Sequence, residues 1–153
     1  MTRRALLRTG IASTALATLP SRAESPRSIH VVKGTGCACC EAWVAYLREA
    51  GFVGADEQIY GTLLIRCKLD KGVPQRRLPC HTGLIAGYVL AGHVPVADIN
   101  RLLNETPDAI GLTVPGMPFG LPGMVDETDR EAYDVFSINR EGTTEVFASY
   151  PEA

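Results

Sequence analysis

Three of the five cysteines in this 153-residue chain lie within four positions, in the run Cys37-Ala38-Cys39-Cys40. The run falls between a predicted strand and a predicted helix, and the N–H groups and dipole at a helix N-terminus stabilise a thiolate. Because a thiolate is both a metal ligand and a redox nucleophile, the C-x-x-C pair of Cys37 and Cys40 is compatible with either chemistry. Cys39 favours a metal site, since a third thiol beside a redox pair would invite wrong disulfides.

A second group of candidate ligands begins at Cys80-His81, directly after a proline. In the fold predicted below, this junction faces the start of the first helix, so we expect Cys80 to complete a thiolate cluster. His81 is either a ligand or hydrogen-bond partner of the metal site, or a loop histidine bonded to backbone. His93 has the same two interpretations. Cys67 stands alone and is interpreted as a buried or incidental thiol.

The methionines are confined to one loop once Met1 is set aside. Met117 and Met124 each follow a Pro-Gly pair within residues 115–124. Thioether sulfur is a soft ligand that suits Cu(I), and a set of thiolates and thioethers favours Cu(I) over Zn(II). We therefore predict that one of them, Met124 in preference to Met117, approaches the cysteines. The alternative is that both methionines only pack over the core.

Hydrophobic patterning predicts an α/β fold. Strands are expected at residues 28–33 and 52–55, helices at 41–50 and 95–104, and hairpins at 82–86 with 88–91 and at 133–138 with 144–149. Residues 60–69 are compatible with strand or helix, and residues 113–124 read as a loop. The order β-α-β, then β-β-α, is that of a thioredoxin-like core whose first helix begins at the cysteines. The last hairpin is an addition to that core.

The first 23 residues resemble a bacterial twin-arginine export signal. Arg3 and Arg4 precede a short apolar stretch at residues 9–19, and Ala23 ends a small-residue cleavage site. The stretch is too short to span a bilayer, which needs roughly 20 apolar residues. The alternative is an ordinary amphipathic helix. We expect cleavage to leave a single periplasmic domain at residues 24–153 with no stable membrane insertion.

The net charge of −2 argues against a nucleic-acid partner, which requires an excess of Lys and Arg. The odd number of cysteines, in an oxidising compartment, argues against a pure disulfide scaffold.

Four ordered motifs together resemble the CopG-type copper-resistance proteins, a family long catalogued as a domain of unknown function. They are the cysteine run with Trp43, Cys80-His81-Thr82, residues 87–95, and residues 115–124. The resemblance implies a periplasmic thioredoxin-like protein that binds copper through its cysteines. Ala38, Pro79 and Leu121 stand where the family pattern has Gly, Ser and Ser.

Three functional hypotheses follow. The first is a copper-binding protein that sequesters Cu(I), or handles its oxidation state, in a site that can be polynuclear, and so contributes to copper resistance. Its partners would be copper ions and other periplasmic copper-handling proteins. The second is a periplasmic thiol-disulfide oxidoreductase that uses Cys37 and Cys40. The third is a structural zinc or iron–sulfur protein. A copper-linked oxidoreductase would combine the first two.

Overall fold

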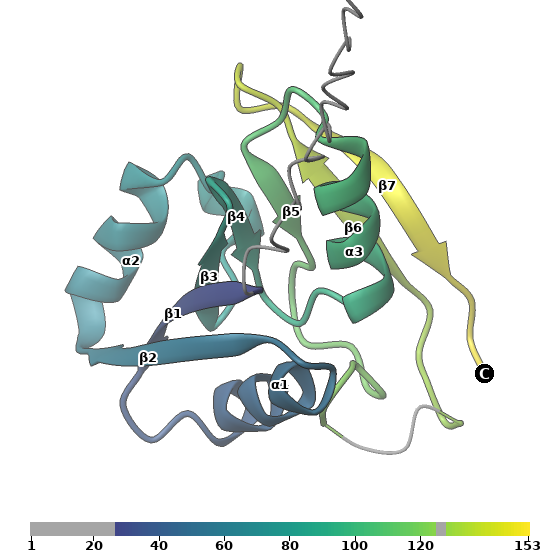
Figure 1. The fold of residues 1–153 in the computed structure, drawn as a ribbon, viewed down its shortest axis with the longest axis horizontal. Coiled ribbons are helices and arrows are strands. Elements are labelled where there is room, and N and C mark those ends of the chain that lie inside the picture. The colour runs from purple at the N-terminus through teal and green to yellow at the C-terminus, as the bar shows by residue number, and fades with distance from the viewer. Residues whose placement is uncertain (1–26, 125–127) are drawn as a thin grey trace, which may run out of the picture.

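The computed structural model describes residues 27–124 and 128–153, so the predicted export signal at residues 1–23 lies outside the described residues. Within these ranges one sheet has the strand order β2-β1-β3-β4-β5-β6-β7, with three α-helices against it (Figure 1). The predicted mixed α/β class is confirmed. The helices of the described part are all too short, or too polar, to span a membrane.

The first unit is β1 (Ser28–Gly34), α1 (Ala38–Glu49) and β2 (Val53–Ile59). β1 and β2 are parallel. The predicted stripe of α1 is buried at Trp43, Val44 and Leu47, and the helix ends before Gly51, whose φ of 84° suits glycine. β2 is longer than the predicted strand at residues 52–55. Its polar residues stay in the strand because β1 supplies backbone partners along its whole length.

The ambiguous segment at residues 60–69 forms a helix, α2 (Gly61–Asp70), followed by the short 3-10 helix η1 (Gln75–Arg77). Local periodicity did not decide between strand and helix because the apolar residues of α2 do not share one buried face. Leu63, Ile65 and Leu69 are exposed, and the buried residue of this helix is Lys68.

The next elements are β3 (His81–Ile85), β4 (Tyr88–Ala91) and α3 (Val96–Glu105). β3 pairs antiparallel with both β1 and β4. α1 and α3 cover one face of the sheet, where Trp43, Leu90 and Ile99 belong to the main core. Val89 and Ala91, which flank Leu90, belong to a smaller cluster on the other face. This alternation explains why β4 is apolar throughout.

The sheet continues through β5 (Gly111–Thr113), β6 (Tyr133–Ile138) and β7 (Thr144–Tyr150). β5 was not predicted, and the expected loop at residues 113–124 begins inside it. This short strand pairs parallel with β4 and antiparallel with β6, so β6 and β7 extend the same sheet. Gly111 permits the close approach, because a Cβ there would lie 1.8 Å from the Val89 carbonyl oxygen.

Gly92 follows β4 at the point where that strand meets the cysteine-bearing segment. Its N–H donates to the His81 carbonyl, and its own carbonyl accepts from His81 Nε2. Gly87, in the β3–β4 turn, has the same φ of 86°. A Cβ on Gly92 would lie 2.5 Å from the Val114 carbonyl oxygen and 3.0 Å from Pro79 Cβ, whereas a Cβ on Gly87 would meet nothing within 4 Å.

Gly92→Ala is therefore expected to destabilise the protein more than Gly87→Ala. Both variants carry the left-handed backbone strain of about 1–2 kcal/mol, and Gly92→Ala adds an overpacking cost of roughly 1–3 kcal/mol. Urea unfolding of the two variants and the wild type measures both costs. Equal losses in the two variants would show that the crowding around Gly92 is not significant.

Candidate metal centre

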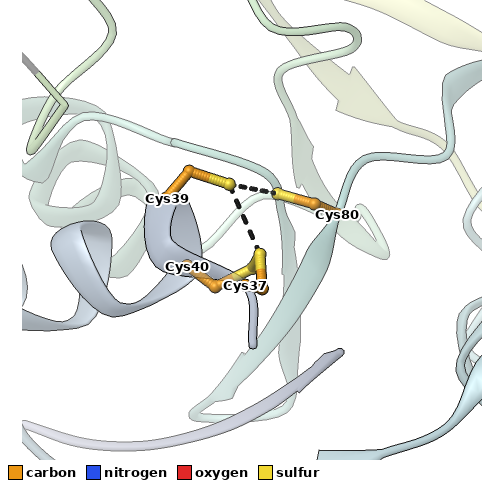
Figure 2. A group of neighbouring side chains, drawn as sticks. All are labelled: Cys37, Cys39, Cys40 and Cys80. Atoms are coloured by element: carbon orange, nitrogen blue, oxygen red, sulfur yellow. Dashed lines mark hydrogen bonds between the residues drawn. A yellow bond between two sulfur atoms is a disulfide. The ribbon is translucent and has the colours of Figure 1, made fainter. Parts of the chain in front are cut away.

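Two segments 40 residues apart in the chain meet at the start of α1. Cys37 is the N-cap residue of α1, and Cys39 and Cys40 lie in its first turn. β1 pairs with its neighbouring strand β3 in a register that sets Lys33 opposite His81. This register sets Cys80, which precedes β3, beside the turn that leads from β1 into α1. The sulfurs of Cys37, Cys39 and Cys80 converge as a result (Figure 2).

The four predicted cysteines form one cluster. Cys39 Sγ lies 3.3 Å from Cys37 Sγ and 3.6 Å from Cys80 Sγ, and the four sulfurs all lie within 4.8 Å of one another. Cys40 is fully buried, while the other three are half-buried. Cys67 is a free cysteine outside this cluster. Cys80 thus lies beside the cysteine run, and its role as a metal ligand stays a prediction.

Cys37 and Cys40 are joined by a disulfide, and Cys39 and Cys80 are free thiols. A disulfide sulfur is not a thiolate ligand, so all four cysteines can bind metal only after two-electron reduction of this bond. The cluster is therefore both a potential metal site and a potential redox site.

The two predicted histidines lie behind the cysteines, on Trp43. The centroid of the His81 ring lies 4.4 Å from that of the Trp43 ring and 5.0 Å from that of the His93 ring. His81 Nε2 donates to the Gly92 carbonyl at 3.0 Å, which leaves the Nδ1 lone pair facing Cys80 Sγ at 3.3 Å. His93 Nδ1 donates to the Pro122 carbonyl at 2.9 Å, and its Nε2 is buried without a partner. Cys80, His81 and His93 form a second group of possible ligands.

The methionine loop reaches the same region at its C-terminal end. The bond from His93 to the Pro122 carbonyl attaches the loop to the histidines. Next along the chain, Gly123 packs on α1, where a Cβ would lie 2.7 Å from the Ala42 carbonyl oxygen. Met124 is half-buried and packs against the main core, whereas Met117 is 42% exposed. The structure thus brings the Met124 end of the loop toward α1 and leaves Met117 on the surface.

This chain is similar to one protein family and to solved structures. A family model described as "Protein of unknown function, DUF411" matches residues 78–124. A solved structure titled "Copper resistance protein copG- Form 1" is 39% identical, with a TM-score of 0.76, and the match covers 83% of this chain and 99% of that one. For "Copper resistance protein copG- Form 2" the identity is also 39%, the TM-score 0.75, and the coverage 83% and 100%. No protein with a curated description matches.

This chain belongs to the CopG family. The family model ends at Met124, so it spans Cys80, both histidines and the methionine loop but not the first cysteine run. The solved structures extend the likeness over most of the described chain.

Burial sets the protonation states of the side chains at this site. It lowers the pKa of His81 to about 3 and also lowers that of His93, so both rings are neutral and keep a lone pair for a metal. Burial, with the neighbouring Cys39, raises the pKa of Cys80 to about 12. A metal ion that bound to Cys80 would therefore have to displace its proton.

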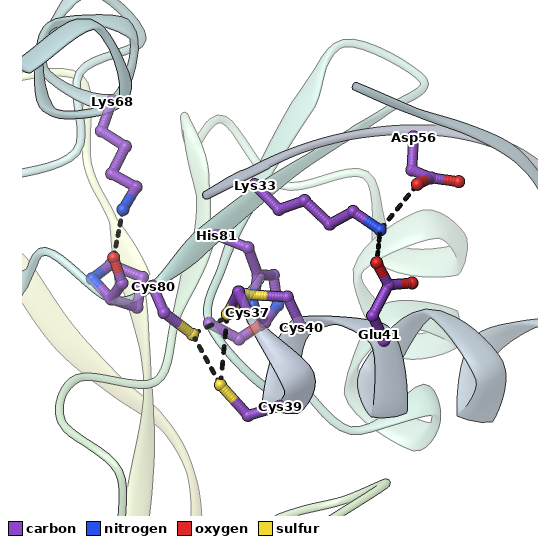
Figure 3. The surroundings of a disulfide bond; sticks show 11 residues. Lys33, Cys37, Cys39, Cys40, Glu41, Asp56, Lys68, Cys80 and His81 are labelled. Atoms are coloured by element: carbon purple, nitrogen blue, oxygen red, sulfur yellow. Dashed lines mark hydrogen bonds and ion pairs between the residues drawn. A yellow bond between two sulfur atoms is a disulfide. The ribbon is translucent and has the colours of Figure 1, made fainter. Parts of the chain in front are cut away.

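Two buried lysines flank the cysteines and were not singled out from the sequence. Lys33 is the residue before the last one of β1, and it forms ion pairs with Glu41 and Asp56. Lys68 reaches in from α2 (Figure 3). For Lys33, its position at the end of an apolar stretch was a sequence signal that could have indicated a buried lysine. For Lys68 the sequence carried no such signal, because the periodicity of α2 was ambiguous.

The two neutral histidines predict a loss of stability in mild acid. Their folded-state pKa values lie below the ordinary value near 6.5, so the unfolded chain takes up protons first as the pH falls. The free energy of unfolding of the metal-free protein should fall below about pH 6.5, by up to about 1.4 kcal/mol per pH unit for each histidine. Urea unfolding from pH 7 to 4.5 measures the slope. His81→Gln and His93→Gln should each make it shallower, and an unchanged slope in both would contradict this account.

Proposed function

We propose that this protein is a periplasmic copper-binding protein that sequesters or redox-handles Cu(I) and thereby contributes to copper resistance. The observation that carries the proposal is the convergence of Cys37, Cys39, Cys40 and Cys80 within 4.8 Å. The likeness to copper resistance protein structures supports copper as the metal.

The donor set suits Cu(I). Reduced cysteines provide soft thiolates that can bridge several ions, which supports a polynuclear site. The His81 Nδ1 and His93 Nε2 lone pairs add neutral nitrogen donors at the buried side, and the orphaned His93 Nε2 is a group that a bound ion would satisfy. Because imidazole and thioether ligands carry no charge, they add bonds to copper without adding to the repulsion among thiolates.

The disulfide favours a second candidate function, a thiol-disulfide oxidoreductase that uses Cys37 and Cys40. Cys39 Sγ, 3.3 Å from Cys37 Sγ, is within range to exchange with this bond. The two functions combine if copper is the electron donor. Two Cu(I) ions would each give one electron to the disulfide, which yields two thiolates and two Cu(II) ions.

Export and fold type belong to the same proposal. We infer that residues 1–23 are a cleaved twin-arginine signal and that residues 24–153 act as one periplasmic domain, with other copper-handling proteins as partners. A thioredoxin-like core is supported by the order β2-β1-β3-β4, in which β1 and β2 are parallel and β3 is antiparallel to β1 and β4. β5 to β7 would then be the addition to that core.

The two-segment site is tested by matched cysteine variants. Cys80→Ser removes a thiolate from the cluster, and Cys67→Ser removes one outside it. In anaerobic titrations of the reduced protein against a competing Cu(I) chelator, Cys80→Ser is expected to bind at least about tenfold more weakly, or to bind fewer ions. Cys67→Ser should match the wild type. Unchanged affinity and stoichiometry in Cys80→Ser would refute the two-segment site.

The methionine loop is tested in the same titration. Leucine replaces methionine at a packing cost typically below about 1.5 kcal/mol, so it removes the thioether but preserves the fold. Met124→Leu is expected to lose Cu(I) affinity or stoichiometry while keeping its affinity for Zn(II). Met117→Leu, at an exposed position, serves as the control. A double variant with wild-type Cu(I) binding would remove the loop from the site.

A further inference from the structure

α2 buries a charged residue and exposes its apolar ones. Lys68 is 3% exposed, whereas Leu63, Ile65 and Leu69 on the same helix are 60%, 48% and 43% exposed. Removing an ammonium group from water is costly, and burying one of these leucines would have been favourable. We therefore expect the ammonium group of Lys68 to have a role other than stabilising the fold.

Lys68 reaches the residue that precedes Cys80 in the cysteine cluster. Its Nζ donates to the carbonyl of Pro79, the residue immediately before Cys80 (Figure 3). In the described part of the chain it pairs with no carboxylate. Burial lowers the pKa of Lys68, and negative charge on the sulfurs of Cys80 and Cys67 would raise it.

Lys33 is the contrasting case. It is buried to a similar degree, but Glu41 and Asp56 both pair with its ammonium group. Its charge is therefore balanced within the protein in every state. The charge of Lys68 is balanced only when cysteine sulfur near it is anionic.

Copper binding would produce that anionic state. A first Cu(I) ion would bring a single positive charge to two or more thiolates, so the occupied site would be negative. Each further ion brings the charge closer to zero. A fixed ammonium in a site of low dielectric stabilises the negative stage most strongly.

We propose that Lys68 is the counter-ion of the copper–thiolate site, a positioning residue that stabilises the anionic cluster at Cys80 without contacting the metal. This role rests on the copper-binding function proposed above. Under this proposal, the buried ammonium group on α2 destabilises the metal-free protein, and the copper-bound protein regains that free energy.

Lys68→Met tests the role because methionine keeps the apolar stem and removes the charge. First-ion Cu(I) affinity, measured anaerobically against a competing chelator, is expected to fall by roughly tenfold or more, with a smaller effect on later ions. Lys68→Arg, which retains a permanent charge, should recover most of the affinity. Lys71→Met removes a charge of the same sign just beyond α2 and should match the wild type.

A second measurement needs no copper. In the reduced, metal-free protein, Lys68→Met is expected to raise the thermal unfolding midpoint by a few degrees, because the cost of burying the ammonium disappears. A purely structural role, in which Lys68 anchors the Pro79 carbonyl, predicts the opposite sign. The counter-ion role requires weaker copper binding together with a more stable apoprotein.

The outcomes separate the two proposals. A wild-type protein that binds no Cu(I) would overturn both the function and the counter-ion role. Wild-type binding with unchanged affinity in Lys68→Met, or with an apoprotein destabilised by that change, would overturn the counter-ion role alone. If the effect of Lys68→Met on copper disappears in a Cys67→Ser background, the ammonium serves Cys67 and the assignment to Cys80 is wrong.

Discussion

The antiparallel pairing of β3 with β1 is the constraint on which the site depends. Its register sets Lys33 opposite His81, and so brings Cys80 to the turn that starts α1. A shift of this register by one residue would turn His81 to the other face of the sheet and carry Cys80 away from Cys39. β4 pairs with the other edge of β3, and Gly92, which follows β4, makes reciprocal hydrogen bonds with His81 that stabilise the position of β3.

Burial gives the cluster its chemical character. Trp43 is fully buried and donates to the Val94 carbonyl. Its ring packs against the tilted ring of His81, so this histidine lies on a buried apolar side chain. Burial favours the neutral forms of the Cys80 thiol and of the two imidazoles, because it raises the pKa of Cys80 and lowers the pKa of His81 and His93. A metal ion bound to Cys80 would therefore replace a proton, and each neighbouring charge would act through a low dielectric.

The segment after β5 lies between the histidines and α1. It is attached at Pro122, whose carbonyl accepts from His93, and it packs on α1 at Gly123. β5, which precedes this segment, pairs with β4 and β6 of the same sheet. The position of this loop is thus coupled to the position of the histidines.

The sequence by itself determined the features that depend on neighbouring residues. The cysteine spacing, the buried stripe of α1, the β3–β4 hairpin and the repeated Pro-Gly-Met units are local patterns, and local sterics and capping are sufficient to fix them. Their order along the chain also pointed to Cys80 as the partner of the cysteine run. Tertiary structure alone decided the helical state of α2, the short strand β5, the length of β2 and the burial of Lys33 and Lys68. Each of these depends on partners from distant segments, because backbone pairing and desolvation are properties of the folded surroundings and not of a residue's own neighbours.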